Sequence, residues 1–226
     1  MKTVGNIHGV TAPDWDELRH GMVEKQLQGR GIVDARVLEA MRRVPRHLFV
    51  PEAHRTHSYD DRALSIDFGQ TISQPFMNAL MLQTLALAGT EKVLEIGSGT
   101  GYQAALLGHL AKEIHSIEIL PELAAQARAN LAALGITNVT VHPIDGSEGL
   151  SEKAPFDAIL VAAGAPDVPP ALLEQLAPGG KLLIPLGDRK LQALTLIIRN
   201  DSRFMRETLT PCAFVPLRGA FGWPQA

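Results

Sequence analysis

Residues 93–103, VLEIGSGTGYQ, decide the fold. A short apolar run contains the acidic Glu95, and three glycines then alternate with small hydroxyl residues. Apolar runs of this length that end at glycine are typical of buried strands. The glycines let the backbone of a strand-to-helix turn come close to a ligand. We therefore expect a ligand-binding loop between a strand and a helix.

The segments after this loop alternate between helix and strand patterns. Helices are expected at residues 102–111, 121–135 and 168–177, and strands at 92–97, 114–119, 138–144, 156–163, 179–187, 191–200 and around 213–219. Such alternation predicts an α/β fold with a mostly parallel, Rossmann-like sheet and helices on both faces. No helix pattern separates the last strands, which indicates an antiparallel edge.

The first third of the chain has a different character. Asp14 is expected to cap a helix over residues 14–28, and Asp34 a second short helix that Pro45 closes. Residues 45–74 are turn-rich and are expected to be functional or to contain short elements. A helix from about Gln74 to Ala88 follows. We interpret residues 1–226 as one domain, in which an N-terminal extension (1–74) joins a core (75–226).

Composition excludes several classes of function. The net charge of -3 provides no basic surface for nucleic acid or for anionic membranes. Residues 1–18 lack the apolar stretch of a signal peptide, and no apolar run is long enough to span a bilayer. The single cysteine, Cys212, fits a reducing compartment. His54 and His57 lack a third ligand at a suitable spacing, so we expect no metal site. These features predict a cytoplasmic protein.

The spacing of the glycines restricts the ligand. Gly97, Gly99 and Gly101 form G-x-G-x-G, without the GK[ST] of a Walker loop or the G-x-G-x-x-G of a dinucleotide site. Glu95 would repel a diphosphate but favours a cationic ligand. S-adenosylmethionine, with its sulfonium and ammonium groups, fits better than a dinucleotide.

Two further acids follow the next two strands. Glu118 stands about where a carboxylate binds ribose hydroxyls in nucleoside sites. Asp145 is placed to accept a hydrogen bond from an adenine amino group, and Gly146 to leave space for the ring. Most acids at strand ends are merely solvated, but three matching positions on consecutive strand ends favour a nucleoside site.

With these residues the chain resembles the class I S-adenosylmethionine-dependent methyltransferases. VLEIGSGTGY is similar to their first motif, and FDAILVAAGAP and LAPGGKLLIPLG to their later strand motifs. Nucleobase amine methyltransferases usually carry [DN]PPY after the fourth strand, where this chain has VAAGAP. Nucleic acid is therefore not the expected substrate.

Residues 67–76, DFGQTISQPF, here called the acceptor segment, are relevant to which methyl acceptor the chain uses. In one interpretation Ser73 or Thr71 caps the helix that begins at Pro75. In the other, the hydroxyl beside the helix N-terminus holds a substrate carboxylate. The two interpretations are compatible.

The resemblance narrows to the protein-L-isoaspartate O-methyltransferase family through GQTISQP, RVPRHLFVP (43–51) and FVPLRG (214–219), and covers Leu18 to Gly219. It implies that Ser73 is the active-site residue and that Thr71, Ser73 and Arg218 bind substrate. Together with the glycine-loop reasoning, it assigns the cofactor to Gln70, Thr71, Ile72, Asn78, Glu95, Gly97, Gly99, Thr100, Gly101, Glu118, Asp145 and Gly146. PIDGSEG (143–149) and IEILPEL (117–123) depart from the family pattern, which affects the expected cofactor affinity.

The resemblance implies methyl transfer from S-adenosylmethionine to the free α-carboxylate of L-isoaspartyl residues in proteins, with later succinimide formation, by a monomeric enzyme. Three alternatives stay open at this point. The chain could methylate a small-molecule carboxylate or hydroxyl, act as a nucleotide-linked oxidoreductase, or bind the cofactor without catalysis. The glycine spacing argues against the oxidoreductase, and the intact acceptor segment against the binding module.

Overall fold

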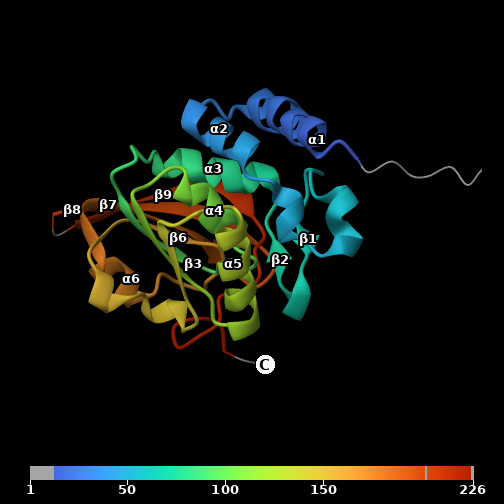
Figure 1. The fold of residues 1–226 in the computed structure, drawn as a ribbon. Helices are drawn as coiled ribbons and strands as arrows, with labels where there is room; N and C mark the ends of the chain where they lie inside the picture. The colour runs from blue at the N-terminus through green and yellow to red at the C-terminus, as the bar shows by residue number, and fades with distance from the viewer. Residues whose placement is uncertain (1–12, 202, 225–226) are drawn as a thin grey trace, which may run out of the picture.

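A seven-stranded sheet forms the centre of the structure, a computed structural model that describes residues 13–201 and 203–224 (Figure 1). In chain order its strands are β3 (Lys92–Ile96), β4 (Glu113–Ile117), β5 (Val139–His142), β6 (Phe156–Val161), β7 (Leu176–Gly187), β8 (Gln192–Asn200) and β9 (Arg203–Cys212). Across the sheet the order is β5-β4-β3-β6-β7-β8-β9, with β3 to β7 parallel and β8 and β9 antiparallel. The predicted α/β sheet with an antiparallel edge is confirmed.

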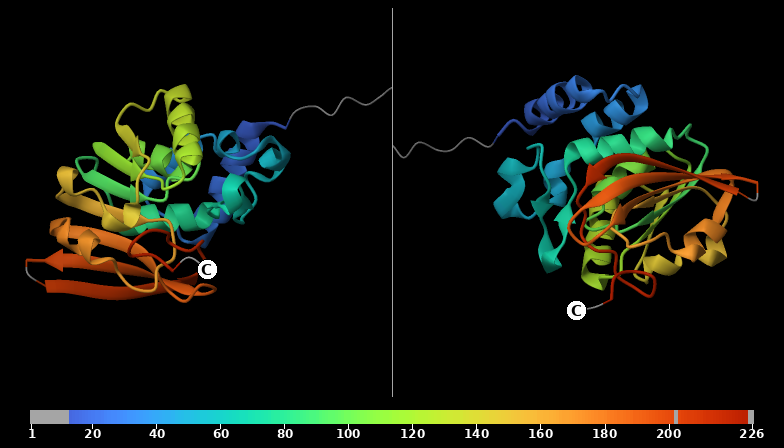
Figure 2. Two further views of the ribbon diagram at one scale, coloured as in Figure 1. Left: turned by 90° about the horizontal axis from the view of Figure 1, so that it is seen from below. Right: turned by 180° about the vertical axis from the view of Figure 1, so that it is seen from behind.

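Helices cover both faces of this sheet. One face packs against α3 (Pro75–Leu85), α4 (Tyr102–Gly108) and α5 (Pro121–Ala133), and the other against α6 (Pro170–Glu174) and the short 3-10 helices Gly146–Glu148 and Ser151–Lys153. Figure 2 shows β7 to β9 as the orange-to-red end of the sheet. Alternate strand residues divide between the two cores: Val93 belongs to the α4 side, and Leu94 and Ile96 to the α6 side.

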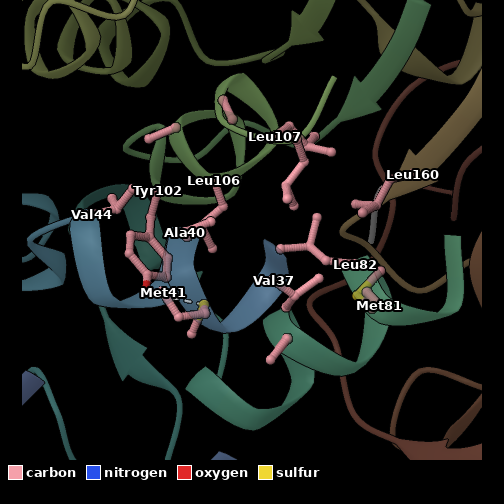
Figure 3. Packing of buried hydrophobic residues seen from close by; sticks show 14 of the residues in the cluster. Val37, Ala40, Met41, Val44, Met81, Leu82, Tyr102, Leu106, Leu107 and Leu160 are labelled. Atoms are coloured by element: carbon pink, nitrogen blue, oxygen red, sulfur yellow. Dashed lines mark hydrogen bonds between the residues drawn. The ribbon is translucent and has the colours of Figure 1, made fainter. Parts of the chain in front are cut away.

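The N-terminal helices form a further layer on the α3 side. Helix α1 (Trp15–Gly21) continues as a π-helical stretch, Met22–Leu27, and a 3-10 turn, Gln28–Arg30; α2 (Ala35–Arg43) follows. Asp14 and Asp34 cap α1 and α2 through backbone N–H groups two and three residues on, as predicted. In Figure 3, Val37 and Met41 of α2 meet Leu82 of α3 and Tyr102 of α4. This packing joins the N-terminal helices to the helix that follows the glycine loop.

The turn-rich region contains short elements. The 3-10 helices Arg46–Phe49 and Glu52–His57 precede a two-stranded antiparallel ladder of β1 (Leu64–Ser65) and β2 (Thr71–Ile72). This ladder brings residues 70–72 next to the sheet, and Ser73 joins it to α3. The prediction of hidden short elements is therefore confirmed.

The last predicted strand is wrong. Residues 213–219 contribute only one isolated bridge, between Gly164 and Pro216, and the edge strand β9 lies earlier, at Arg203–Cys212. Proline has no backbone N–H to donate to a neighbouring strand, so Pro216 disfavours a regular strand at this position. The true edge strand carries mostly exposed side chains. Its sequence therefore has little of the apolar alternation that indicates a half-buried strand.

Within residues 13–201 and 203–224, no helix combines the length and apolarity needed to cross a bilayer. Residues 1–12, on which most of the signal-peptide interpretation depends, lie outside the described residues.

Candidate active site

A cleft lies where the parallel strand order reverses, at the carboxyl ends of β3, β4 and β6. Its empty volume is about 560 Å³, and a second hollow of about 370 Å³ adjoins it. The two share Thr71, Gly97, Gly99 and Ala162. The first is lined by the ends of β4 and β6 and by residues 215–218, and the second by Ser73, Asn78 and the start of α4. The acceptor segment and the glycine loop therefore line two adjoining spaces with shared walls.

The backbone of the glycine loop is bonded within the protein. Gly97 and Ser98 both donate their N–H groups to the Ile117 carbonyl (2.8 and 3.1 Å), and Gly101 donates to Ser98 (2.8 Å). Gly97 and Gly101 have φ values of 94° and 95°, which favour glycine. A phosphate-binding loop presents free N–H groups to its ligand. The loop therefore does not suit a diphosphate, in agreement with the spacing argument.

Glu118 stands at the cleft beside this loop. Its carboxylate accepts hydrogen bonds from the N–H groups of Gly99 (2.8 Å) and Leu120 (3.1 Å) and is only 6% exposed. Burial raises the pKa of Glu118, although these N–H groups and the Arg218 guanidinium oppose the shift. Apolar Ile117, Ile119 and Leu120 surround the carboxylate. A carboxylate between apolar walls suits a nucleoside with free ribose hydroxyls, so these residues fit S-adenosylmethionine.

Asp145 has a different place from the one expected. Its Oδ1 accepts from the N–H and hydroxyl of Ser147 (both 2.8 Å), and its Oδ2 accepts from the N–H of Ala220 (2.7 Å). Only its neighbour Gly146 lines the cleft. Asp145 thus joins the C-terminal segment to the end of β5, and Gly146 lines the cleft.

Glu95 also differs from expectation. It is fully buried on the α4 face of the sheet, opposite Ser116 of β4, and does not line the cleft. Ser116 donates to its Oε2 and is itself bonded to Ser98, while Oε1 has no partner within the described residues. Burial raises the pKa of Glu95 to about 8. The carboxyl is therefore mostly neutral at pH 7. Of the three bonded residues Glu95, Ser116 and Ser98, only Ser98 lines the hollow.

The acceptor segment leaves the Ser73 hydroxyl available. Helix α3 begins after Gln74, and no side chain caps it. Ser73 lines the second hollow, and its hydroxyl makes no hydrogen bond within the described part of the chain. Capping of α3 by Ser73 or Thr71 is therefore wrong. Gln70 and Thr71 line the cleft, and Ile72 and Asn78 line the hollow with Thr100.

The backbone of Ser73 is held from behind by Arg46, a residue that sequence reasoning did not single out. Arg46 is fully buried and donates to the carbonyls of Ser58 (2.7 Å) and Ser73 (2.8 Å). Its guanidinium lies 4.9 Å from the centroid of the Tyr102 ring, and burial lowers its pKa to about 10. The buried amide of Asn78 contacts that of Gln103, and with the oxygen and nitrogen of Asn78 exchanged its NH2 group donates to the Ser73 carbonyl (3.0 Å).

The same segment reaches the glycine loop. The hydroxyl of Thr100 donates to the carbonyl of Phe49 (2.7 Å), three residues after Arg46. Residues 46–49 therefore join the acceptor segment to the loop. The only sign of this link in the sequence was the charged residue Arg46 within RVPRHLFVP.

The C-terminal segment closes one side of the cleft. Gly164, after β6, accepts from the N–H of Leu217 (2.8 Å) and donates to the carbonyl of Val215 (2.8 Å). Trp223 donates its ring N–H to the same Gly164 carbonyl (3.0 Å). Arg218 lines the cleft on the Glu118 side. The segment is thus placed beside the Glu118 carboxylate rather than beside Ser73.

This sheet, the bonded glycine loop and the carboxylate after the second parallel strand define a class I S-adenosylmethionine-dependent methyltransferase. The family model for protein-L-isoaspartate(D-aspartate) O-methyltransferase matches residues 18–221, and the chain belongs to this family.

Several known proteins are similar to the chain. A protein-L-isoaspartate O-methyltransferase 2 from Marinobacter nauticus is 54% identical over 93% of this chain and 97% of its own length. A protein-L-isoaspartate O-methyltransferase from Geobacter metallireducens is 51% identical over 93% and 98%. Among solved structures, a Plasmodium falciparum beta-aspartate methyltransferase (PCMT) in complex with S-adenosyl-L-homocysteine has a TM-score of 0.77 at 27% identity, over 88% of this chain and 98% of that one.

Glu118→Gln is expected to weaken S-adenosylmethionine binding about tenfold, because the change removes the charge from an acceptor that is buried at the cleft. Titration calorimetry measures the affinity. Glu122→Gln, at an exposed position four residues on, is the matched control and should bind as the unchanged protein does. Equal affinity of all three proteins would contradict a cofactor role for Glu118.

Proposed function

We propose that the chain methylates the free α-carboxylate of L-isoaspartyl residues in damaged proteins, with Ser73 orienting the acceptor. The observation that carries this proposal is that Ser73, whose hydroxyl makes no hydrogen bond within the described residues, lines the hollow that adjoins the Glu118 cleft. Family membership supports the reaction, since the matched model describes this activity. The methyl ester that forms then closes to a succinimide without the enzyme.

The cofactor would lie along Gly97, Gly99, Glu118 and Gly146, with its reactive end toward Thr71 and Ser73. When bound, S-adenosylmethionine supplies a methyl group activated by a sulfonium. Ser73 and Thr71 donate hydrogen bonds that hold the substrate carboxylate in line with that group. Arg46 and Asn78 hold the Ser73 backbone, and residues 215–218 limit access of water.

The reaction needs no catalytic base in this site. A carboxylate has a pKa of about 3.9 and is already ionised at neutral pH. Its oxygen would accept the methyl group that the cofactor supplies when bound. No proton moves, so correct positioning accounts for most of the catalysis.

The test is transfer of labelled methyl groups to two synthetic peptides, one with L-isoaspartate and one with aspartate at the same site. Base-labile label is expected on the isoaspartyl peptide alone. Label on neither peptide, from a protein that still binds the cofactor, would contradict the substrate. A small-molecule carboxylate would then be the next candidate.

Ser73→Ala is expected to lower kcat toward the isoaspartyl peptide about tenfold to a hundredfold, because one hydrogen bond to a charged group is lost. Cofactor affinity should change little. Ser65→Ala, in the neighbouring strand β1 and exposed, is the matched control and should keep full activity. Full activity of Ser73→Ala would remove Ser73 from the proposed site.

We further propose a monomeric, cytoplasmic, single-domain protein that does not act on nucleic acid. The net charge of -3 and a single cysteine support this proposal. Cys212 is buried, and burial raises the pKa of its thiol to about 11, which makes it a poor nucleophile at neutral pH. Light scattering after size-exclusion chromatography tests the oligomeric state, and a mass of twice 24.4 kDa would contradict a monomer.

A further inference from the structure

A second depression opens beside the cleft, here called the mouth groove. It is lined by Gly69, Gln70, Arg189, residues 215–218, Trp223 and Pro224, and its empty volume is about 850 Å³. It shares Gln70 and residues 215–218 with the cleft. The mouth groove therefore adjoins the cleft in which the cofactor is proposed to bind.

Among the described residues, both charged side chains that line the mouth groove are basic. They are Arg189, in the turn between β7 and β8, and Arg218. Arg189 is held in place, since it donates to the Pro224 carbonyl (2.6 Å) and lies 5.2 Å from the centroid of the Trp223 ring. The neighbouring Asp188 carboxylate accepts from the N–H groups of Lys190 (2.7 Å) and Leu191 (2.8 Å) and does not line the groove.

Two carboxylates near Arg218, those of Glu118 and Asp145, do not line the groove, and Asp145 is already bonded to Ser147 and Ala220. Glu118 faces Arg218 from the cleft side and is already bonded to two backbone N–H groups. The protein as a whole is negative, with a net charge of -3, so the basic character of the groove is local. A local basic groove beside a reaction site favours an anionic partner.

The distance between Ser73 and the mouth groove suits a substrate polypeptide that extends from the isoaspartate into the groove. The chain runs from Gly69 in the mouth groove to Ser73 through strand β2, and an extended chain advances about 3.3 Å per residue. A substrate whose isoaspartate lies at Ser73 would place in the groove a residue two to four positions away. The volume of the groove is sufficient for side chains of that segment.

We propose that the mouth groove binds the substrate chain beside the isoaspartate and favours an acidic residue two to four positions away, with Arg189 as a determinant of this preference. The inference rests on the proposed function, because the groove matters only if the acceptor is part of a polypeptide. Arg189 acts by attracting the flank and takes no part in methyl transfer.

The test compares two isoaspartyl peptides that differ only in the residues flanking the isoaspartate. One peptide carries Asp and Glu in the flank, and the other carries Asn and Gln. Separate pairs place these residues before or after the isoaspartate. For the unchanged protein kcat/KM is expected to favour the acidic flank about threefold to fivefold, as exposed ion pairs do. Arg189→Gln should reduce this ratio by at least half, because kcat/KM for the acidic peptide falls more than kcat/KM for the neutral peptide. Raising the salt to about 0.5 M should have the same effect.

Lys190→Gln is the matched control. It removes one positive charge from the same turn, but Lys190 is exposed and does not line the groove. Its flank preference should equal that of the unchanged protein. Equal rates for both flanks, or a preference that Arg189→Gln leaves intact, would overturn the inference while the proposed function stands. Methylation of neither peptide would overturn both.

Discussion

Arg46→Met is expected to lower the free energy of unfolding by about 3 kcal/mol and to lower kcat at least tenfold. Methionine fills much of the space but donates no hydrogen bond. The buried carbonyls of Ser58 and Ser73 would each lose the partner that now lies at 2.7 or 2.8 Å. An unpaired buried carbonyl costs about 1–3 kcal/mol.

One effect opposes this loss. No carboxylate forms a salt bridge with Arg46 within the described residues, and burial alone lowers its pKa to about 10. Removing a buried cation therefore relieves some desolvation cost. The expected loss in free energy of unfolding is for this reason smaller than the summed cost of two unpaired carbonyls. No corresponding effect offsets the loss of kcat, because the Ser73 carbonyl loses the hydrogen bond that holds its backbone in place.

Urea denaturation measures stability, and single-turnover methyl transfer measures kcat on the folded fraction. Arg43→Met, at an exposed position in the same motif, is the matched control and should change stability by less than about 0.5 kcal/mol. Arg46→Lys keeps the charge but cannot span both carbonyls, so it should restore stability more than activity. Full kcat in Arg46→Met would contradict the positioning role.

Glu95→Gln is expected to change how stability depends on pH. The pKa of Glu95 is raised from 4.5 to about 8 in the folded protein, so the folded state keeps a proton that the unfolded state releases. Stability from this group is fully present below pH 4.5 and is lost as the pH rises to about 8. One pKa unit corresponds to about 1.4 kcal/mol. Between about pH 5.5 and pH 8 the unchanged protein should therefore lose about 3 kcal/mol relative to the variant.

The measurement is urea denaturation of both proteins across this pH range. The variant can be less stable at every pH, because the glutamine amide brings donors to a site where Oε1 has no partner. The prediction concerns only the difference in slope. Glu148→Gln, at an exposed position, should run parallel to the unchanged protein. Parallel curves for Glu95→Gln would contradict a neutral buried Glu95.

Much of the active site followed from local patterns. Gly97, Gly99, Glu118 and Gly146 line the cleft, because the carboxyl ends of neighbouring parallel strands meet at one edge of a sheet, whereas the predicted Gly101 packs against Ala127 and lines neither the cleft nor the hollow. The displaced edge strand has an equally local explanation, since β9 is exposed and its side chains carry no alternation. Strand periodicity also explains Glu95: Leu94 and Ile96 face the α6 side, so Glu95 must face the α4 side.

The sequence by itself determined the alternation of strands and helices from β3 to β8 and the ligand class of the glycine loop. These depend on periodicity, turn residues and spacing, which act over a few positions. Only the tertiary structure decided which polar groups remain available. Asp145 is bonded to Ala220, 75 residues away, and Arg46 to Ser73, 27 residues away. Such pairs form because packing brings distant backbone groups together and burial then requires each of them to find a partner.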